Sequence, residues 1–149
     1  MIARLLLAAM LAFVCLAEVR ADPMPTEKRR QYEPYSRGTS HTLGTMWLST
    51  TYARFSRLKG RMLLEHAGVW PEDGNFELRG AKIYRVTNPE PYFELNKGKN
   101  GFCGEPVRWI GVRKLGGDEV RVTFFTIADY RAYNPNSHGL CSGDSYTLG

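Results

Sequence analysis

The stretch between Gly101 and Leu148 constrains the fold of this chain most, because it carries a strand–turn–strand pattern. Residues 106–114 lead into Gly116-Gly117-Asp118, and residues 119–127 lead back. The returning segment alternates with the period of two that strands show, with Val120, Val122 and Phe124 on one face and Arg121 and Thr123 on the other. Glycine supplies the positive φ that a tight hairpin turn needs. The sequence therefore predicts a β-hairpin.

Residues 1–21 have the layout of an export signal. Arg4 supplies a positive start, an apolar run covers 5–17, and 19–21 form a small-x-small cleavage pattern. A membrane-spanning helix needs about 20 apolar residues, and Glu18 ends this run early. Lipidation at Cys15 is a minor alternative, because the preceding valine is larger than such a site favours. We predict cleavage after residue 21 and a periplasmic or secreted protein.

The predicted mature chain has 128 residues, enough for one domain, and two cysteines. Cys103 precedes the predicted hairpin and Cys141 follows it, 38 positions later. Two thiols in an exported chain favour a disulfide. Neither cysteine has a CxxC partner or a histidine at ligand spacing, which disfavours a metal or catalytic pair. We predict a Cys103–Cys141 disulfide that stabilises the fold by about 4 kcal/mol.

The rest of the chain alternates short apolar segments with turn residues. Strands are predicted at 45–50, 61–65, 75–79, 82–87, 92–95 and 145–148, with long loops at 66–75, 96–105 and 128–144. Together with the hairpin these make seven or eight strands, which favours an all-β fold, a small antiparallel β-barrel or sandwich. Closure into a barrel is favoured because it removes exposed strand edges.

Two segments depart from this pattern. In residues 51–59, Tyr52, Phe55 and Leu58 fall three apart, which favours one short helix near 50–59 over a strand. Residues 22–42 are polar and carry three prolines, which predicts an N-terminal arm ahead of a single β domain over 43–149.

Charge is distributed unevenly along the chain. Residues 28–61 hold eight basic residues and one acid, whereas the rest of the predicted mature chain holds ten basic and thirteen acidic residues. This asymmetry predicts an anionic partner for the N-terminal third. The candidate binding residues are Arg54, Arg57, Lys59, Arg61 and the loop residue Trp70. Export disfavours nucleic acid as the partner, and leaves an envelope protein, an anionic polymer or a membrane surface.

One short segment resembles an enzyme motif. Residues 141–145, Cys-Ser-Gly-Asp-Ser, resemble the Gly-Asp-Ser segment around the nucleophile of chymotrypsin-like serine proteases. That family continues with glycines that help form its oxyanion hole, whereas Tyr146-Thr147 follow here and the chain ends four residues after Ser145. We therefore predict a turn before the last strand. The histidines, at 41, 66 and 138, show no ligand spacing, and we predict no catalytic residue, metal or cofactor.

These observations favour an exported, non-enzymatic binding protein that contacts an envelope protein or anionic polymer through loops and a basic surface. The layout resembles small bacterial envelope proteins such as lysozyme inhibitors and META-type domains, in architecture and without a shared motif. The alternative is a lipocalin-like barrel that carries an apolar ligand. The two differ in whether large side chains such as Trp109 and Phe124 fill the interior. A hydrolase built from loop residues is the third hypothesis.

Overall fold

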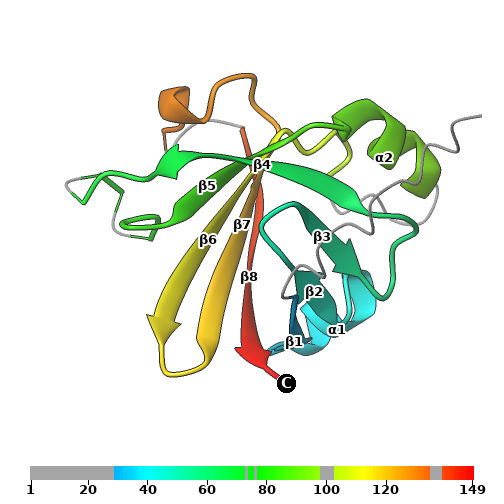
Figure 1. Ribbon diagram of the computed structural model, residues 1–149. Coiled ribbons are helices and arrows are strands. Elements are labelled where there is room, and N and C mark those ends of the chain that lie inside the picture. Colours follow the sequence, from blue (N-terminus) through cyan, green and yellow to red (C-terminus); the bar gives the residue numbers. More distant parts are fainter. Residues whose placement is uncertain (1–28, 73, 76, 98–102, 135–138) are drawn as a thin grey trace, which may run out of the picture.

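Eight antiparallel strands form a closed barrel in the computed structural model of this chain, which describes residues 29–72, 74–75, 77–97, 103–134 and 139–149 (Figure 1). The strands are β1 (Arg30–Pro34), β2 (Met46–Leu48), β3 (Tyr52–Phe55), β4 (Met62–Val69), β5 (Lys82–Val86), β6 (Trp109–Gly116), β7 (Glu119–Phe125) and β8 (Leu140–Leu148). Each strand pairs with the next, and β8 pairs with β1. The predicted barrel and its strand number are confirmed; the predicted leader and residues 22–28 lie outside the described residues.

The predicted hairpin is β6 and β7. Val122 lies opposite Val112, and Phe124 lies opposite Ile110. The turn contains Gly117, whose φ of 54° is accessible to glycine at little cost. The face that carries Val120, Val122 and Phe124 is the inner face of the barrel, where Val122 and Phe124 are fully buried.

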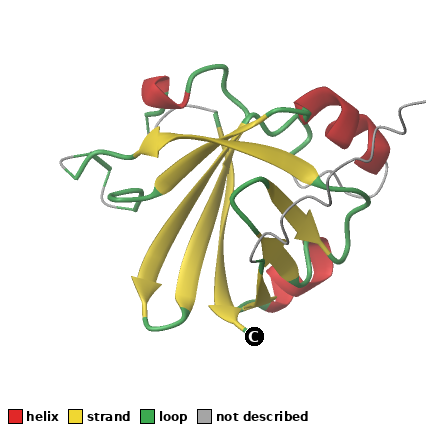
Figure 2. Cartoon of the chain, viewed as in Figure 1, coloured by secondary structure: helices red, strands yellow, loops and turns green. Residues whose placement is uncertain are grey.

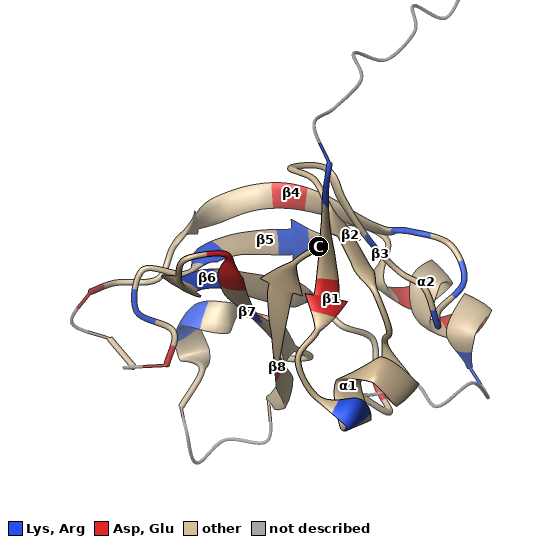
Figure 3. Cartoon of the chain, turned by 90° about the horizontal axis from the view of Figure 1, so that it is seen from below, with Lys and Arg blue, Asp and Glu red and all other residues tan. Residues whose placement is uncertain are grey.

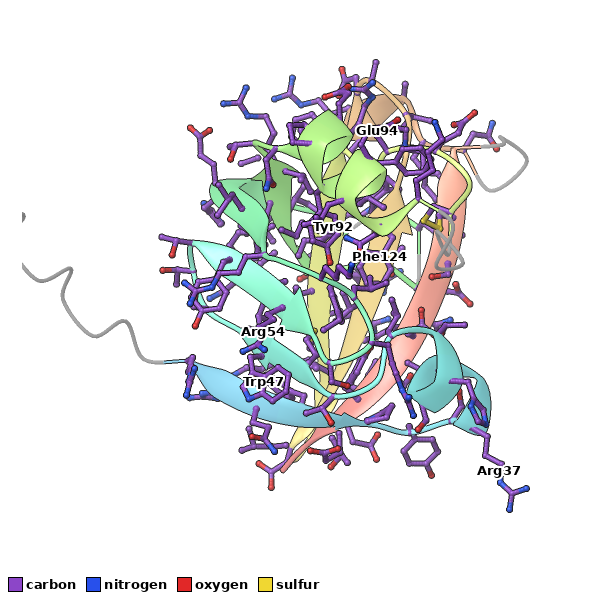
Figure 4. The ribbon with its side chains drawn as sticks, turned by 90° about the vertical axis from the view of Figure 1, so that its right-hand side faces the viewer. Arg37, Trp47, Arg54, Tyr92, Glu94 and Phe124 are labelled. Atoms are coloured by element: carbon purple, nitrogen blue, oxygen red, sulfur yellow. A yellow bond between two sulfur atoms is a disulfide. The ribbon has the colours of Figure 1, made fainter. Side chains whose placement is uncertain are left out.

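The middle of the barrel is filled by side chains. Phe124 meets Phe55 edge-on, with ring centroids 5.8 Å apart, and Figure 4 shows Phe124 in the interior. The largest fully buried inward-facing side chains are Tyr146, Phe55, Phe124, Met46, Met62, Ile110 and Val122. Trp109 faces outward instead, where its ring packs against Tyr130. The barrel centre is therefore a solid core.

Helix α2 (Pro89–Asn96) closes one end of the barrel (Figure 2). Its Tyr92 is buried in the core, and this burial raises the pKa of the phenol. Asn96 fastens the helix to the β3–β4 turn: its Oδ1 accepts from the Lys59 amide at 2.7 Å, and its Nδ2 donates to the Lys59 carbonyl at 3.1 Å. The predicted disulfide is present here, since Cys103 and Cys141 are bonded with Cα atoms 5.1 Å apart and pack against the same core.

A second core lies outside the barrel, on the outer faces of β5, β6 and β7. Its centre is Trp70, which is 7% exposed and stacks on Phe125 with ring centroids 6.3 Å apart. The remaining members are Leu78, Ala81, Ile127, Tyr130 and Tyr133 from the segments after β4 and β7, and Ile83 and Trp109 from the strands themselves. These segments bury the outer face of the sheet.

The N-terminal arm predicted over 22–42 is wrong for residues 30–42, which form β1 and helix α1 (Arg37–Thr42). Tyr32 points into the core, and Thr39 Oγ1 donates to Asp144 Oδ1 at 2.6 Å. Both contacts join distant parts of the chain, so local composition carries no sign of them. Asp144 and Ser145 also lie within β8, and not in a turn before the last strand.

The short helix predicted near 50–59 is also wrong, because residues 52–55 form β3. Ala53 and Phe55 point inward, with an exposed Arg54 between them, so the period is two. The Ser49 hydroxyl accepts from the Thr51 and Tyr52 amides at 3.2 and 3.0 Å. The Ser49 hydroxyl therefore accepts from backbone amides, as a capping serine does at the start of a helix, but here it stabilises the β2–β3 turn.

Four further segments differ from prediction. Residues 92–95 belong to α2, which begins at Pro89, a residue whose fixed φ suits the first turn of a helix. The loop predicted over 66–75 begins four residues late, because β4 continues to Val69. Residues 77–80 form turns where a strand was predicted over 75–79, and β8 takes up the end of the predicted 128–144 loop.

Candidate functional site

The barrel has a cavity of about 600 Å³ at the end opposite α2. Ser49 and Thr50, in the β2–β3 turn, line this cavity, whereas α2 contacts the β3–β4 turn at the other end of β3. We call this cavity the barrel mouth. The other described residues that line it are Arg30, Tyr32, Leu48, Glu72, Arg79, Gly80, Lys82, Tyr84, Val112, Arg113, Lys114 and Val120.

Three cations stand on the inner face at the rim of the mouth: Arg30 on β1, Lys82 on β5 and Lys114 on β6. Side chains two residues apart in a strand share a face. Arg30 and Lys82 therefore point to the same side as the buried Tyr32 and Tyr84. Figure 3, seen from the end that carries the C-terminus, shows basic segments on β1, β5 and β6. Three strands that are distant in sequence thus bring positive charge to one opening.

A less polar layer lies one step deeper. Tyr32 and Tyr84 are each 7% exposed and Val120 is 4% exposed, whereas Leu48 and Val112 are half-buried and line the cavity. Burial, together with the neighbouring Tyr32 phenol, raises the pKa of Tyr84. Like any phenol, the Tyr84 hydroxyl is neutral at physiological pH, and it has a proton to donate.

The outer lip of the mouth comes from the segment after β4 and from β6. Arg79 and Arg113 add two cations there, and Glu72 is the only acid among the described lining residues. Five basic side chains against one acid give the cavity a positive potential, which a concave low-dielectric wall focuses. The arrangement can attract and hold an anion.

The basic residues singled out from the sequence lie elsewhere, around β3 and the β3–β4 turn. The Arg54 guanidinium lies over the Trp47 ring, 5.2 Å from its centroid, as Figure 4 shows, and that of Arg61 lies 4.6 Å from the Tyr52 centroid. The pairing of Ala53 with Met62 places these two arginines beside each other on the outer face of the barrel.

The other two members of that predicted group lie in the β3–β4 turn. Arg57 Nε donates to the Ser40 carbonyl at 3.3 Å, and Lys59 is held through its backbone by Asn96. Both side chains are exposed. The four residues therefore form a basic outer face, defined as Arg54, Arg57, Lys59 and Arg61, that is separate from the mouth.

Trp70, predicted from the sequence as a binding residue, lies in the second core. It is too deeply buried to anchor a partner, and it packs on the outer faces of β5–β7 and does not cap the barrel. The functional reading of Trp70 is replaced by a structural one, because the segment after β4 folds back over the sheet and covers the ring.

The mouth cations are not among the residues predicted from the sequence. A usable signal exists, because each of the three lies two positions from an inward apolar or aromatic residue: Arg30 with Tyr32, Lys82 with Tyr84, and Lys114 with Val112. What the sequence does not give is the barrel closure that places β1 and β5 around the same opening as β6.

The described part of the chain offers little support for metal binding or for catalysis by histidine or aspartate. It contains no group of three or more metal-ligating side chains. His41 and His66 are exposed, the latter edge-on to Tyr84 with centroids 5.5 Å apart, and the third histidine lies outside the described ranges. Asp144 accepts hydrogen bonds from Thr39 and Ser142, which gives it a structural role. None of the helices in the described ranges has the length and hydrophobicity to cross a bilayer.

Comparison of the chain with protein-family models, with curated proteins and with solved structures finds no match. The functional assignment therefore depends on the geometry of the barrel mouth.

Proposed function

We propose that this chain is an exported, non-enzymatic binding protein that holds an anionic molecule in the barrel mouth. The observation that carries the proposal is the set of three inward-facing cations, Arg30, Lys82 and Lys114, around one cavity. The leader-like N-terminus and the disulfide fit an exported protein, since disulfides persist in oxidising compartments.

Inward positions of a small barrel normally carry the side chains that fill it. Cations at such positions repel one another, and neighbouring carboxylates would relieve that repulsion. Within the described ranges, none of the three forms an ion pair, while Arg85, Lys97, Arg108 and Arg121 all do. An anion bound between the three cations would supply the missing countercharge through charge-assisted hydrogen bonds.

The double variant Lys82→Glu/Lys114→Glu is expected to weaken binding of inorganic tripolyphosphate at least tenfold, because a charge-assisted hydrogen bond contributes about 1.5–3 kcal/mol. Isothermal titration calorimetry at low and high salt measures this, and wild-type affinity should fall as salt rises. Arg37→Glu is the matched control, since Arg37 is exposed on α1 and points away from the barrel (Figure 4). Equal affinity of the double variant and the control would refute the proposal.

The carrier hypothesis in its lipocalin-like form finds less support. Phe124 and Phe55 occupy the barrel centre, and Tyr146 lies beside them with no exposed surface. A long apolar chain has no room there. The space available to a ligand is at the mouth.

The basic outer face is a second candidate, as a contact for an anionic envelope polymer. The observation in its favour is the stacking of Arg54 on Trp47 and of Arg61 on Tyr52. A guanidinium held over a ring is restricted in its motion and keeps N–H groups available for carboxylates or phosphates.

The triple variant Arg54→Ser/Arg57→Ser/Arg61→Ser is expected to lose most of any salt-dependent retention on peptidoglycan or anionic vesicles. The reason is that exposed charges act over a Debye length of about 10 Å at 0.1 M salt. Co-sedimentation at two salt concentrations measures it, with Arg37→Glu as control. Identical sedimentation of wild type and triple variant, with no effect of salt, would leave this face without a role in binding.

A further inference from the structure

The barrel mouth has two layers, and their order bears on the kind of anion that it takes. Each rim cation stands one step above a less polar residue of its own strand: Arg30 above Tyr32, Lys82 above Tyr84, and Lys114 above Val112. Leu48 and Val120 complete the lower layer from β2 and β7. Charge is therefore outermost and apolar surface is innermost, on every strand that contributes a rim cation.

We infer that the ligand of the mouth is an anionic amphiphile, with its charged head at the rim and a short apolar group against the lower layer. This inference rests on the proposed function and specifies its ligand class. A fully hydrated polyanion would satisfy the rim but leave the half-buried Leu48 and Val112 of the lower layer in contact with water. An apolar group displaces that water, and burial of apolar surface contributes about 25 cal/mol per Å².

The depth of the mouth limits the apolar group to a short one. Two residues of a strand advance by about 6.7 Å, which is the distance from the rim to the lower layer. The next inward residues are Val86, Ile110, Val122 and Met46, each no more than 4% exposed. They close the floor, so a chain of about five or six carbons fills the available depth.

Polar groups in the lower layer fix the orientation of the ligand. Tyr84 is a phenol and is protonated at neutral pH, so it can donate to an oxygen near the head but cannot neutralise a charge. The three cations at the rim are the groups that can neutralise the charge of the head. A ligand inserted head first would place its charge among Val120, Val112 and Leu48, where desolvation of an unpaired charge is costly.

A series of n-alkyl phosphates from ethyl to decyl, below their micelle concentrations, tests the inference by titration calorimetry. Affinity is expected to rise about three- to fourfold per methylene up to hexyl, and then to change less than twofold from hexyl to decyl. The matching alkyl carboxylates should follow the same chain-length profile, which separates the role of the tail from the chemistry of the head.

Two variants test whether the lower layer contacts the apolar group of the ligand. Val112→Ser and Leu48→Ser each make the half-buried lower layer more polar and leave the rim cations intact. Each should reduce the gain from ethyl to hexyl at least threefold, whereas Arg37→Glu, on α1 and outside the mouth, should leave both this gain and the tripolyphosphate affinity unchanged. Two variants are used so that one can fail to fold without loss of the test, and the thermal midpoint of each reports folding.

The outcomes separate the inference from the proposed function. Rim-dependent binding of tripolyphosphate, with no dependence of alkyl phosphate affinity on chain length, would overturn the amphiphile assignment and leave the anion site in place. An affinity that continues to rise through octyl and decyl would also overturn it, because the packed floor admits no longer chain. If neither tripolyphosphate nor the alkyl phosphates bind at the rim, both the proposed function and the amphiphile assignment are refuted.

Discussion

Trp70→Ala is expected to lower the free energy of unfolding by about 3–5 kcal/mol, the range for removing a buried aromatic side chain. The ring is 7% exposed, stacks on Phe125 and also contacts Tyr130 and Tyr133 at centroid distances of 5.9 and 6.0 Å. Its removal would take away the side chain against which the segments after β4 and β7 pack. Chemical denaturation followed by far-ultraviolet circular dichroism measures the loss.

Trp70→Phe is the matched control. The indole Nε1 is buried without a hydrogen-bond partner among the described residues, so phenylalanine removes an unsatisfied donor and keeps most of the apolar contact. The cost should be below about 1.5 kcal/mol. An alanine variant as stable as wild type, but impaired in tripolyphosphate binding, would contradict the structural role assigned to Trp70.

Cys103→Ala is expected to lower the free energy of unfolding by about 2–5 kcal/mol. The disulfide closes a loop of 38 positions and ties β8 to the segment that follows α2. Without it, the unfolded chain gains conformational freedom, and the core around the cysteines loses a covalent link. The reduced wild-type protein should show the same loss as the variant in a denaturant titration.

Cys141→Ala supplies the control for that result, since either cysteine alone should produce the same change. A difference greater than about 1 kcal/mol between the two variants would mean that the thiols contribute through packing as well as through the bond. Two free thiols titrated in natively exported protein would contradict the disulfide.

The sequence was informative where the fold depends on local periodicity. Val120, Val122 and Phe124 alternate with polar residues around a Gly-Gly turn, and this pattern becomes the β6–β7 hairpin. The disulfide was predictable from two cysteines in a chain with a leader-like start. The strand number also matches, although two predicted strands, 75–79 and 92–95, correspond to turns over 77–80 and to part of a helix, and β1 and β3 take their place in the barrel.

The sequence was misleading where a short apolar run is compatible with both a helix and a strand. Tyr52, Phe55 and Leu58 have helical spacing, but Phe55 and Leu58 enter the core from β3 and from the following turn. Residues 92–95 are a short, mostly apolar run after a proline-containing turn, but Asn96 and Tyr92 lie one helical turn apart and face the barrel together. Tertiary contacts decided both cases.

The candidate site was missed for a related reason. The charge asymmetry drew attention to Arg54, Arg57, Lys59 and Arg61, which are close in sequence and form the basic outer face. The mouth cations lie 52 and 32 positions apart along the chain. Only the pairing of β1 with β8 and of β5 with β6 brings them around one opening.

A titration of isotope-labelled protein with inorganic tripolyphosphate at low salt, followed by amide chemical shifts, tests the role of the barrel mouth most directly. We expect saturable shifts at Arg30, Leu48, Lys82 and Lys114, and none in α1 or α2. The same titration at high salt should show much weaker binding. Shifts confined to residues 54–61, or no saturable shifts at all, would contradict an anion site in the mouth.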